Sequence, residues 1–322
     1  MAMINPGSEL PSTLGGAGWR PRASSHADEV SGGRIWSRCG YRSEVERLRA
    51  VLLAWPPDSL GSIDSPRDQL MTARVDPVAM RAQASAIADA FHRSGVEVHV
   101  ARPGHRAPPN VVFMRDLFFM TPEGAIVART ASAQRAGEER FAAEALAMAG
   151  FPILCTVSGH ATFEGADALW LADNTVLIGV GFRTNRAGAA MVGAVLAAQG
   201  VSTITVELGP GVQHLLGAVA FLDRQLAALH PQGASARLRG LLGEHGYRLV
   251  ELGPDAELAD GKAMNLVALA PRRVLMPSGS PRVRARLEAE AVQVDEVEVG
   301  EYLKAAGGLG CLTGILRRDP NT

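Results

Sequence analysis

The sequence predicts an α/β protein built from several copies of one strand–helix unit. Short runs rich in Val, Ile and Leu alternate with segments whose apolar residues recur at helical spacing. The recurring unit is a strand hairpin, a helix and a further strand, and its spaced repetition predicts radial or stacked repeats. No G-x-G-x-x-G or G-x-x-x-x-G-K-S/T motif lies between a strand and a helix, which argues against a dinucleotide or P-loop site.

The composition indicates a globular protein of a reducing compartment. The chain has 322 residues, 47% hydrophobic and 20% charged, and a formal net charge of −1. This charge gives no reason to expect nucleic acid or an anionic membrane as a partner. Three cysteines do not make a disulfide framework, and we see neither a secretory signal nor an apolar stretch long enough to span a bilayer. We therefore expect a cytoplasmic protein that binds a small molecule; a homodimer is left open.

The chain divides into an extension and one large domain. Residues 1–36 are rich in Gly, Ser, Pro and Arg and predict a poorly ordered extension, and residues 37–322 predict a single domain. Residues 58–76 predict a loop long enough to cover a site, and whether it closes as a lid is left open.

Strands and helices follow from the apolar spacing. The strands are expected at 51–55, 96–100, 111–120, 125–128, 151–157, 168–171, 175–180, 202–208, 219–222, 247–252, 264–269, 274–276, 292–299 and 311–317. The helices are expected at 77–94, 137–149, 186–200, 236–245 and 282–290.

Cys311 lies in a glycine-rich stretch at residues 305–314. Glycine lets the backbone approach a ligand closely, and a thiolate is a strong nucleophile when its surroundings lower its pKa. Cys311 is therefore a candidate nucleophile. The alternative is a glycine-rich turn that carries a buried structural cysteine into the last strand.

Three acidic residues fall at the entrances of the predicted hairpins. Asp116 interrupts an apolar run, where a charge is costly unless it is paired. It could pair internally, or it could meet a cationic ligand. Glu164 and Asp167 flank Gly165 at a strand entrance, where they could satisfy turn N–H groups. Glu164 could instead orient a catalytic imidazole or hold a guanidinium, and Asp167 is a substrate-binding candidate.

His214 is the histidine best placed for catalysis. It follows Gly209-Pro210-Gly211 and precedes an apolar strand, and His160 is a weaker rival. A lone histidine at such a place is usually a satisfied core group, so a catalytic role needs a nucleophile beside it. Metal binding is disfavoured, because the chain has no H-x-x-x-H or C-x-x-C pair.

Two arginines stand at the same separation from two of the acids. Arg135 lies 19 residues after Asp116, and Arg183 lies 19 residues after Glu164 (135 − 116 = 183 − 164 = 19). Arginines in this position could form paired hydrogen bonds with a substrate carboxylate. The alternative is a pair of surface salt bridges at helix starts.

The order of these segments resembles a known family. The matching segments are residues 109–116, 163–167, 181–185, 214–215, 264–266 and 307–313. Together they resemble the guanidine-modifying (pentein) superfamily, which contains arginine deiminases, dimethylarginine dimethylaminohydrolases and amidinotransferases. The resemblance runs from about residue 43 to residue 318.

The resemblance implies a five-bladed α/β propeller with a central active site and no cofactor. By this resemblance, Cys311 attacks a guanidinium carbon and forms a covalent thiouronium adduct. His214 protonates the departing amine and then activates water. Glu164 and Asp116 are expected to hold the guanidinium, and Arg135 and Arg183 to bind an amino-acid carboxylate.

The resemblance implies a hydrolase that converts arginine or a methylated arginine to citrulline and an amine. Leu216 replaces the Asp that deiminases and amidinotransferases usually carry after His-Leu, and so favours a substituted guanidine. Arg115 is more typical of deiminases, Trp55-Pro56-Pro57 differs from the usual end of the first strand, and Glu164 favours a hydrolase. An amidinotransferase and a non-catalytic binding module are the alternatives.

Overall fold

Five small sheets built on one plan make up the described part of the chain. The computed structural model describes residues 10–104, 107–253, 256–259 and 262–320. Within these ranges, every sheet has three strands: the middle strand pairs antiparallel with one neighbour and parallel with the other. This pattern confirms the predicted hairpin–helix–strand unit, because an antiparallel pair needs only a turn whereas a parallel pair needs a crossover.

Each sheet is one blade, and each blade is written here as antiparallel strand, middle strand and parallel strand. The blades are β15(Gly314–Arg318)–β1(Leu48–Ala54)–β2(Glu97–Ala101), β3(Phe118–Thr121)–β4(Gly124–Val127)–β5(Ile153–Thr156), β6(Ala168–Ala172)–β7(Thr175–Val180)–β8(Ser202–Glu207), β9(Val219–Asp223)–β10(Leu226–Leu229)–β11(Arg248–Glu251) and β12(Val267–Ala270)–β13(Arg273–Pro277)–β14(Gln293–Val297).

One helix bridges each parallel pair. The five crossover helices are α2(Pro77–Arg93), α4(Glu139–Met148), α5(Arg186–Ala197), α6(Ala236–Glu244) and α8(Pro281–Glu288). Three of them begin at a side chain that accepts hydrogen bonds from the first turn: Asp76 for α2, Asn185 for α5 and Ser235 for α6. Such caps satisfy N–H groups that have no partner inside the helix. The sequence therefore marks the helix starts locally.

The remaining helical segments are short and belong to the connections. They are α1(His26–Gly32), α3(Met114–Leu117), α7(Ala256–Ala259), α9(Gly300–Lys304) and α10(Leu309–Leu312), with 3₁₀ turns at Ser12–Leu14, Asp58–Ser62, Pro66–Gln69, Pro109–Val112, Ala133–Arg135, Gly165–Asp167 and Leu215–Gly217.

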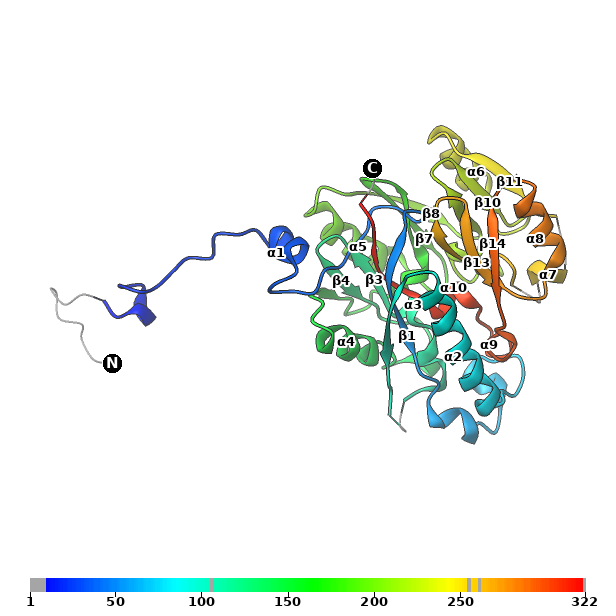
Figure 1. Ribbon diagram of the computed structural model, residues 1–322, viewed down its shortest axis with the longest axis horizontal. Helices are drawn as coiled ribbons and strands as arrows, with labels where there is room; N and C mark the ends of the chain where they lie inside the picture. The colour runs from blue at the N-terminus through cyan, green and yellow to red at the C-terminus, as the bar shows by residue number, and fades with distance from the viewer. Residues whose placement is uncertain (1–9, 105–106, 254–255, 260–261, 321–322) are drawn as a thin grey trace.

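The blades close into a ring because the last strand completes the first blade. β15 pairs antiparallel with β1, which joins the two ends of the domain in one sheet. β15 also contacts β3 of the second blade, and β9 contacts β12. Figure 1 shows the red C-terminal strand beside the blue β1 in the middle of the molecule. The expected five-bladed α/β propeller is confirmed.

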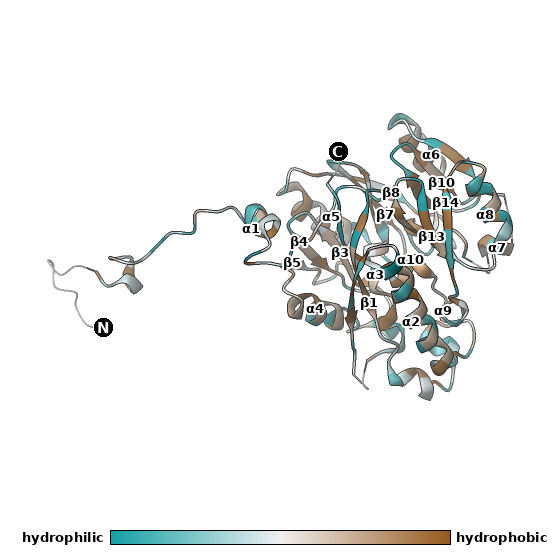
Figure 2. Cartoon of the chain, viewed as in Figure 1, coloured by the Kyte–Doolittle hydropathy of each residue, from teal (hydrophilic) through white to brown (hydrophobic). Residues whose placement is uncertain are grey.

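The strands carry most of the apolar core. β3, β4 and β9 to β10 are buried along nearly their whole length, and Figure 2 shows mostly brown strands in the middle of the molecule. Tyr41, Phe119 and Trp170 form a cluster with ring centroids 6.0–6.3 Å apart. Aromatic rings at such distances add to the stability that burial provides.

Two segments near the centre differ from the strands expected there. Residues 109–117 form a 3₁₀ turn and α3, so only Phe118–Thr121 of the expected strand 111–120 is extended. Cys311 lies on α10 rather than in the last strand, which begins at Gly314. In both places the chain is apolar because it is buried on all sides, and a buried helical turn has the same composition as a buried strand.

The first described residues also contain structure. Helix α1 begins at a capping box formed by Ser25 and Asp28, and the His26 imidazole lies 2.9 Å from the carbonyl oxygen of Glu123. The chain before α1 runs out from the body of the molecule (Figure 1). Residues 1–9 of the predicted extension lie outside the described ranges. Among the described helices, none is long and apolar enough to cross a membrane.

Candidate active site

The loop that carries Cys311 approaches its neighbours too closely for side chains. A Cβ on Gly307 would lie 2.0 Å from the Phe113 ring, and one on Gly308 would lie 2.8 Å from the Asn265 side chain. Glycine is therefore required at both positions. The close packing leaves Cys311 7% exposed. The thiol is thus held on a short, well-packed turn at the centre of the ring.

Asn265 meets Cys311 from the fifth blade. Its Nδ2 donates to Cys311 Sγ at 3.0 Å, and its Oδ1 accepts from the Cys311 backbone N–H at 2.9 Å. The sequence did not indicate a role for Asn265, because nothing in its local pattern shows what it contacts. The only signal was its place in one of the six matching segments.

His214 is joined to two of the predicted acids. Its Nε2 lies 2.7 Å from Glu164 Oε2, and its Nδ1 lies 3.9 Å from Asp116 Oδ1. All three side chains are buried. The 3₁₀ turns that precede β6 and β9 contact each other, which brings together residues 50 positions apart. The rival His160 is exposed.

Arg135 and Arg183 pair with the acids that precede them by 19 residues. Arg135 Nη1 lies 2.7 Å from Asp116 Oδ2 and 3.4 Å from Glu164 Oε2, and Arg183 Nη1 lies 3.3 Å from Glu164 Oε1. Arg135 also binds Glu138 at 2.8 Å. These ion pairs are buried, in contrast to the surface salt bridges considered as the alternative. That either arginine binds a substrate carboxylate stays a prediction.

Asp167 holds the backbone on which His214 is carried. Its Oδ1 accepts from the Leu215 N–H at 2.9 Å, and its Oδ2 accepts from the Thr184 hydroxyl at 2.6 Å. Burial is the main cause that raises the pKa of Asp167, to about 6. Both of its oxygens have protein partners, and its predicted contact with substrate stays a prediction.

The charges of this cluster keep His214 protonated. Burial alone would lower the pKa of His214, but Asp116, Asp167 and Glu164 together raise it to about 9. Burial would raise the pKa of Glu164, yet the hydrogen bond from His214 and the charges of His214, Arg135 and Arg183 hold it well below its usual range. Near neutral pH the pair is therefore an imidazolium and a carboxylate, which makes His214 a proton donor.

The surroundings of Cys311 favour its neutral thiol form. Burial and the charge of Asp116 raise its pKa, whereas the Gly308 backbone, the Asn265 amide and the charge of Lys262 lower it. The direction overall is upward. A cation brought beside the sulfur would favour the thiolate, which is the reactive form.

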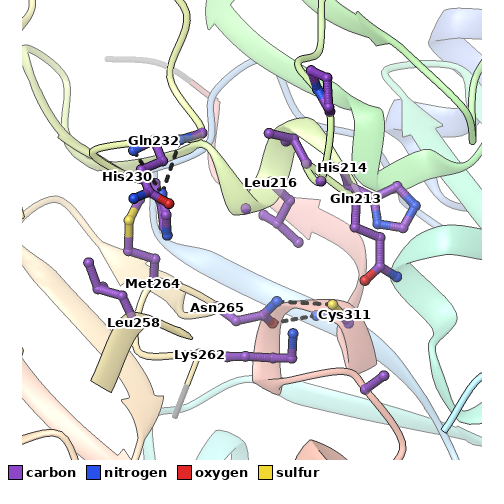
Figure 3. A pocket seen from close by; sticks show the side chains of 16 residues that line it. Gln213, His214, Leu216, His230, Gln232, Leu258, Lys262, Met264, Asn265 and Cys311 are labelled. Atoms are coloured by element: carbon purple, nitrogen blue, oxygen red, sulfur yellow. Dashed lines mark hydrogen bonds between the residues drawn. The ribbon is translucent and has the colours of Figure 1, made fainter. Parts of the chain in front are cut away.

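Cys311 and His214 line one cavity of about 360 Å³. Leu216, Asn265, Lys262 and His230 also line it, and Figure 3 shows the Gln213 side chain between the histidine and the cysteine, with Leu216 to one side. Asp116 Oδ1 has no hydrogen-bond partner among the described residues. An unpaired buried carboxylate oxygen is costly, so it is a natural acceptor for a cationic group.

The same cluster offers a possible donor set for a metal ion. One atom each of Asp116, Glu164 and His214 lie within 4.8 Å of one another. The donor chemistry does not fit, because a protonated imidazole has no lone pair for a metal and the Glu164 oxygens already face cations. We assign no metal-dependent step to this site.

The comparison with known proteins agrees with this arrangement of fold and site. The family model for arginine deiminase matches residues 106–232. A dimethylarginine dimethylaminohydrolase from Mycobacterium tuberculosis is 30% identical over 248 residues, which are 76% of this chain and 78% of that protein. Its counterpart from Pseudomonas aeruginosa is 28% identical over 232 residues, 72% of this chain and 86% of that protein.

Solved structures show the same fold. The P. aeruginosa dimethylarginine dimethylaminohydrolase complexed with citrulline superimposes with a TM-score of 0.70 at 24% identity, over 83% of this chain and 98% of that chain. The fold places this chain among proteins built as the same ring of small sheets. The chain belongs to the guanidine-modifying (pentein) superfamily, in the group that includes the dimethylarginine dimethylaminohydrolases and arginine deiminases.

Proposed function

We propose that this protein hydrolyses a C–N bond of a linear guanidino compound, arginine or a methylated arginine, and releases citrulline and an amine. The observation that carries the proposal is that Cys311 and His214 line one cavity while His214 is paired with Glu164 at 2.7 Å. A nucleophile, a proton donor and an orienting acid are the three parts that covalent catalysis requires.

The first half-reaction splits the substrate. The Cys311 thiolate adds to the guanidinium carbon, the C–N bond to the departing nitrogen breaks, and the His214 imidazolium gives that nitrogen its proton. The products are an amine and a thiouronium on Cys311. In the second half, the neutral His214 takes one proton from water as the water attacks the same carbon. The C–S bond then breaks with its electron pair going to sulfur, the remaining hydroxyl proton of the adduct passes to solvent as the C=O forms, and the ureido product and the thiolate are released.

The buried acids favour a cationic substrate. Asp116 Oδ1 is unpaired among the described residues, and it lies 3.9 Å from His214 Nδ1. A guanidinium placed there satisfies the oxygen and brings a positive charge close to the thiol. Binding then lowers the pKa of the nucleophile, because an opposite charge stabilises the thiolate. The substrate thus helps to ionise the group that attacks it.

Leu216 favours a substituted guanidine. Its side chain lines the cavity near Cys311 (Figure 3), where an aspartate would bind a second guanidinium nitrogen. An apolar side chain accepts a methyl group without leaving a buried polar atom unpaired. We therefore place methylated arginines ahead of arginine among the substrates.

A substrate panel tests the proposal. Purified protein is incubated with arginine, monomethylarginine and dimethylarginine, and citrulline is measured together with the mass of the Cys311 peptide. We expect citrulline and a trapped adduct on Cys311, and for Cys311→Ser a loss of activity on the order of 10⁴-fold or more. Cys155→Ser is the matched control and should retain activity, since Cys155 lies in β5 away from the cavity.

Each alternative has its own outcome. Transfer of the amidino group to added glycine or lysine, without citrulline, would replace the hydrolase by an amidinotransferase. No product and no adduct with a haloacetamidine would indicate a non-catalytic binding module.

A further inference from the structure

Asn265 has no role in the two half-reactions described above, yet it makes several contacts with Cys311 and its loop. Its side chain makes two hydrogen bonds to Cys311, and its backbone carbonyl accepts from the Gly310 N–H at 3.0 Å. A Cβ on Gly310 would lie 3.0 Å from Asn265 Oδ1. The fifth blade is therefore fitted closely to the Cys311 loop at this one residue.

The orientation of the Asn265 amide follows from the backbone. The Cys311 N–H can only donate, so the amide oxygen has to face it at 2.9 Å. The amide nitrogen then has to face the sulfur at 3.0 Å. This assignment does not depend on distinguishing oxygen from nitrogen in the side chain. An N–H group directed at sulfur stabilises a thiolate more than a thiol, because hydrogen bonds to charged acceptors are the stronger ones.

Lys262 lies on the same turn. The Asn265 N–H donates to the Lys262 carbonyl oxygen at 2.8 Å, so the two residues are fixed relative to each other. Figure 3 shows the Lys262 side chain extended beside Asn265 and Cys311 along the cavity. Of the other ionisable groups, Asp116 opposes the ionisation of the thiol, His214 lines the same cavity, and His230 lines it on the far side beside Gln232 (Figure 3).

We propose that the turn Lys262–Asn265 is the thiolate-stabilising element of this site: Asn265 donates a hydrogen bond to the Cys311 sulfur, and Lys262 supplies positive charge. The proposal deepens the proposed function and rests on it for the meaning of a reactive thiol. The ionisation itself is simple: the S–H bond breaks, the proton goes to water and the electron pair stays on sulfur. Asn265 touches the reacting atom and is therefore a catalytic residue in this scheme.

The test measures the reactivity of Cys311 without any substrate. In the full chain with Cys39 and Cys155 replaced by serine, the rate of alkylation by iodoacetamide is followed against pH. Asn265→Asp keeps the acceptor for the Cys311 N–H but loses the donor to sulfur and adds a negative charge, so Asn265→Ala, which loses the donor without adding a charge, is measured beside it. In both variants we expect roughly tenfold slower alkylation at pH 8 and a higher midpoint, since one lost hydrogen bond to a charged group changes an ionisation constant by about that factor.

Lys262→Met is a further variant, in case the Asn265 variants do not fold. We expect its midpoint to rise as well, by less than in Asn265→Asp. Gln232→Glu is the matched control, because it adds a carboxylate to the same cavity on the side away from the sulfur (Figure 3). Its alkylation rate should change by less than about twofold, because a distant charge acts through solvent.

The outcomes are separable from those of the substrate panel. The proposal is overturned if the alkylation rate of Cys311 in folded Asn265→Asp or folded Lys262→Met depends on pH as it does in the protein without that substitution. If only the proposed function fails, the unmodified protein forms no citrulline. The Asn265 and Lys262 variants still show the shifted pH profiles of Cys311 alkylation.

Discussion

At the scale of single residues, the site depends on Glu164, whose two oxygens face three cations. His214 lies at 2.7 Å, Arg183 at 3.3 Å and Arg135 at 3.4 Å. A buried carboxylate is stable only with such compensation. The same contacts explain why His214 stays protonated. Loss of its proton would leave the buried carboxylates with one positive charge fewer to compensate them. Charge balance, rather than exposure to solvent, sets the protonation state of His214.

The pH titration of His214 is the first prediction. In two-dimensional NMR its ring should titrate near pH 9, and in Glu164→Gln the midpoint should fall, because one partner loses its charge.

The raised pKa of His214 also makes the folding stability depend on pH. The folded pKa lies above the ordinary 6.5, so this contribution is fully present below pH 6.5 and is lost as the pH rises through about 9.

His214→Gln identifies the resonance and is the control. The activity should also decline above about pH 9, since the amine then departs without a proton. A ring that titrates between pH 6 and 7 in the unmodified protein would contradict the charge assignment of the whole cluster.

At the scale of elements, the short turns before the strands position the site more than the strands do. Glu164 directly precedes the 3₁₀ turn Gly165–Asp167, and His214 directly precedes the turn Leu215–Gly217. A Cβ on Gly165 would lie 2.1 Å from the Phe118 carbonyl oxygen and 2.5 Å from that of Arg115. The turn is thus in direct contact with the backbone that carries Asp116, and it keeps the two acids in register.

Gly165→Ala tests this contact. Backbone has to move to admit the methyl group, so we expect a loss of about 1–3 kcal/mol in the free energy of unfolding, typical of overpacking. Activity should fall as well, because Glu164 shifts with the turn. Urea denaturation and the citrulline assay measure the two effects.

Gly243→Ala is the matched control. Gly243 lies in α6 with nothing within 4 Å of an added Cβ, and alanine in a helix should raise stability by about 0.5–1 kcal/mol. Equal effects of the two substitutions would show that the contact of Gly165 with the second blade has no importance.

At the scale of the whole molecule, the ring brings distant parts of the chain to one place. Asp116, Glu164, His214 and Cys311 come from different blades, and each lies shortly before the antiparallel strand of its blade. The ring is complete only when β15 pairs with β1, in register from Leu48 with Arg318 to Leu52 with Gly314. Closing the ring buries an edge of β1 that would otherwise be free to pair with another chain.

Removal of residues 314–322 should therefore abolish cooperative folding, although every proposed catalytic residue remains. We expect loss of the thermal transition in circular dichroism and aggregation in size-exclusion chromatography. Removal of residues 1–20 is the control and should leave the melting temperature and the activity nearly unchanged, because this segment precedes α1. A truncated chain without β15 that still melts cooperatively would show that ring closure is dispensable.

The sequence alone predicted the repeated unit and the five crossover helices, and it named the candidate site residues. Helical and strand periodicity and the glycines around Cys311 are local signals, because each depends on neighbours in the chain. The separation of 19 residues between each acid and its arginine was also visible, and both pairs form buried ion pairs.

Only the tertiary structure decided what lies against what. It showed that residues 109–117 are helical, that Asn265 holds the cysteine and that Arg135 is shared by Asp116, Glu138 and Glu164. Burial on all sides erases the periodicity that separates a helix from a strand. The direction of a hydrogen bond between residues 46 positions apart depends on the closed ring, which no local pattern records.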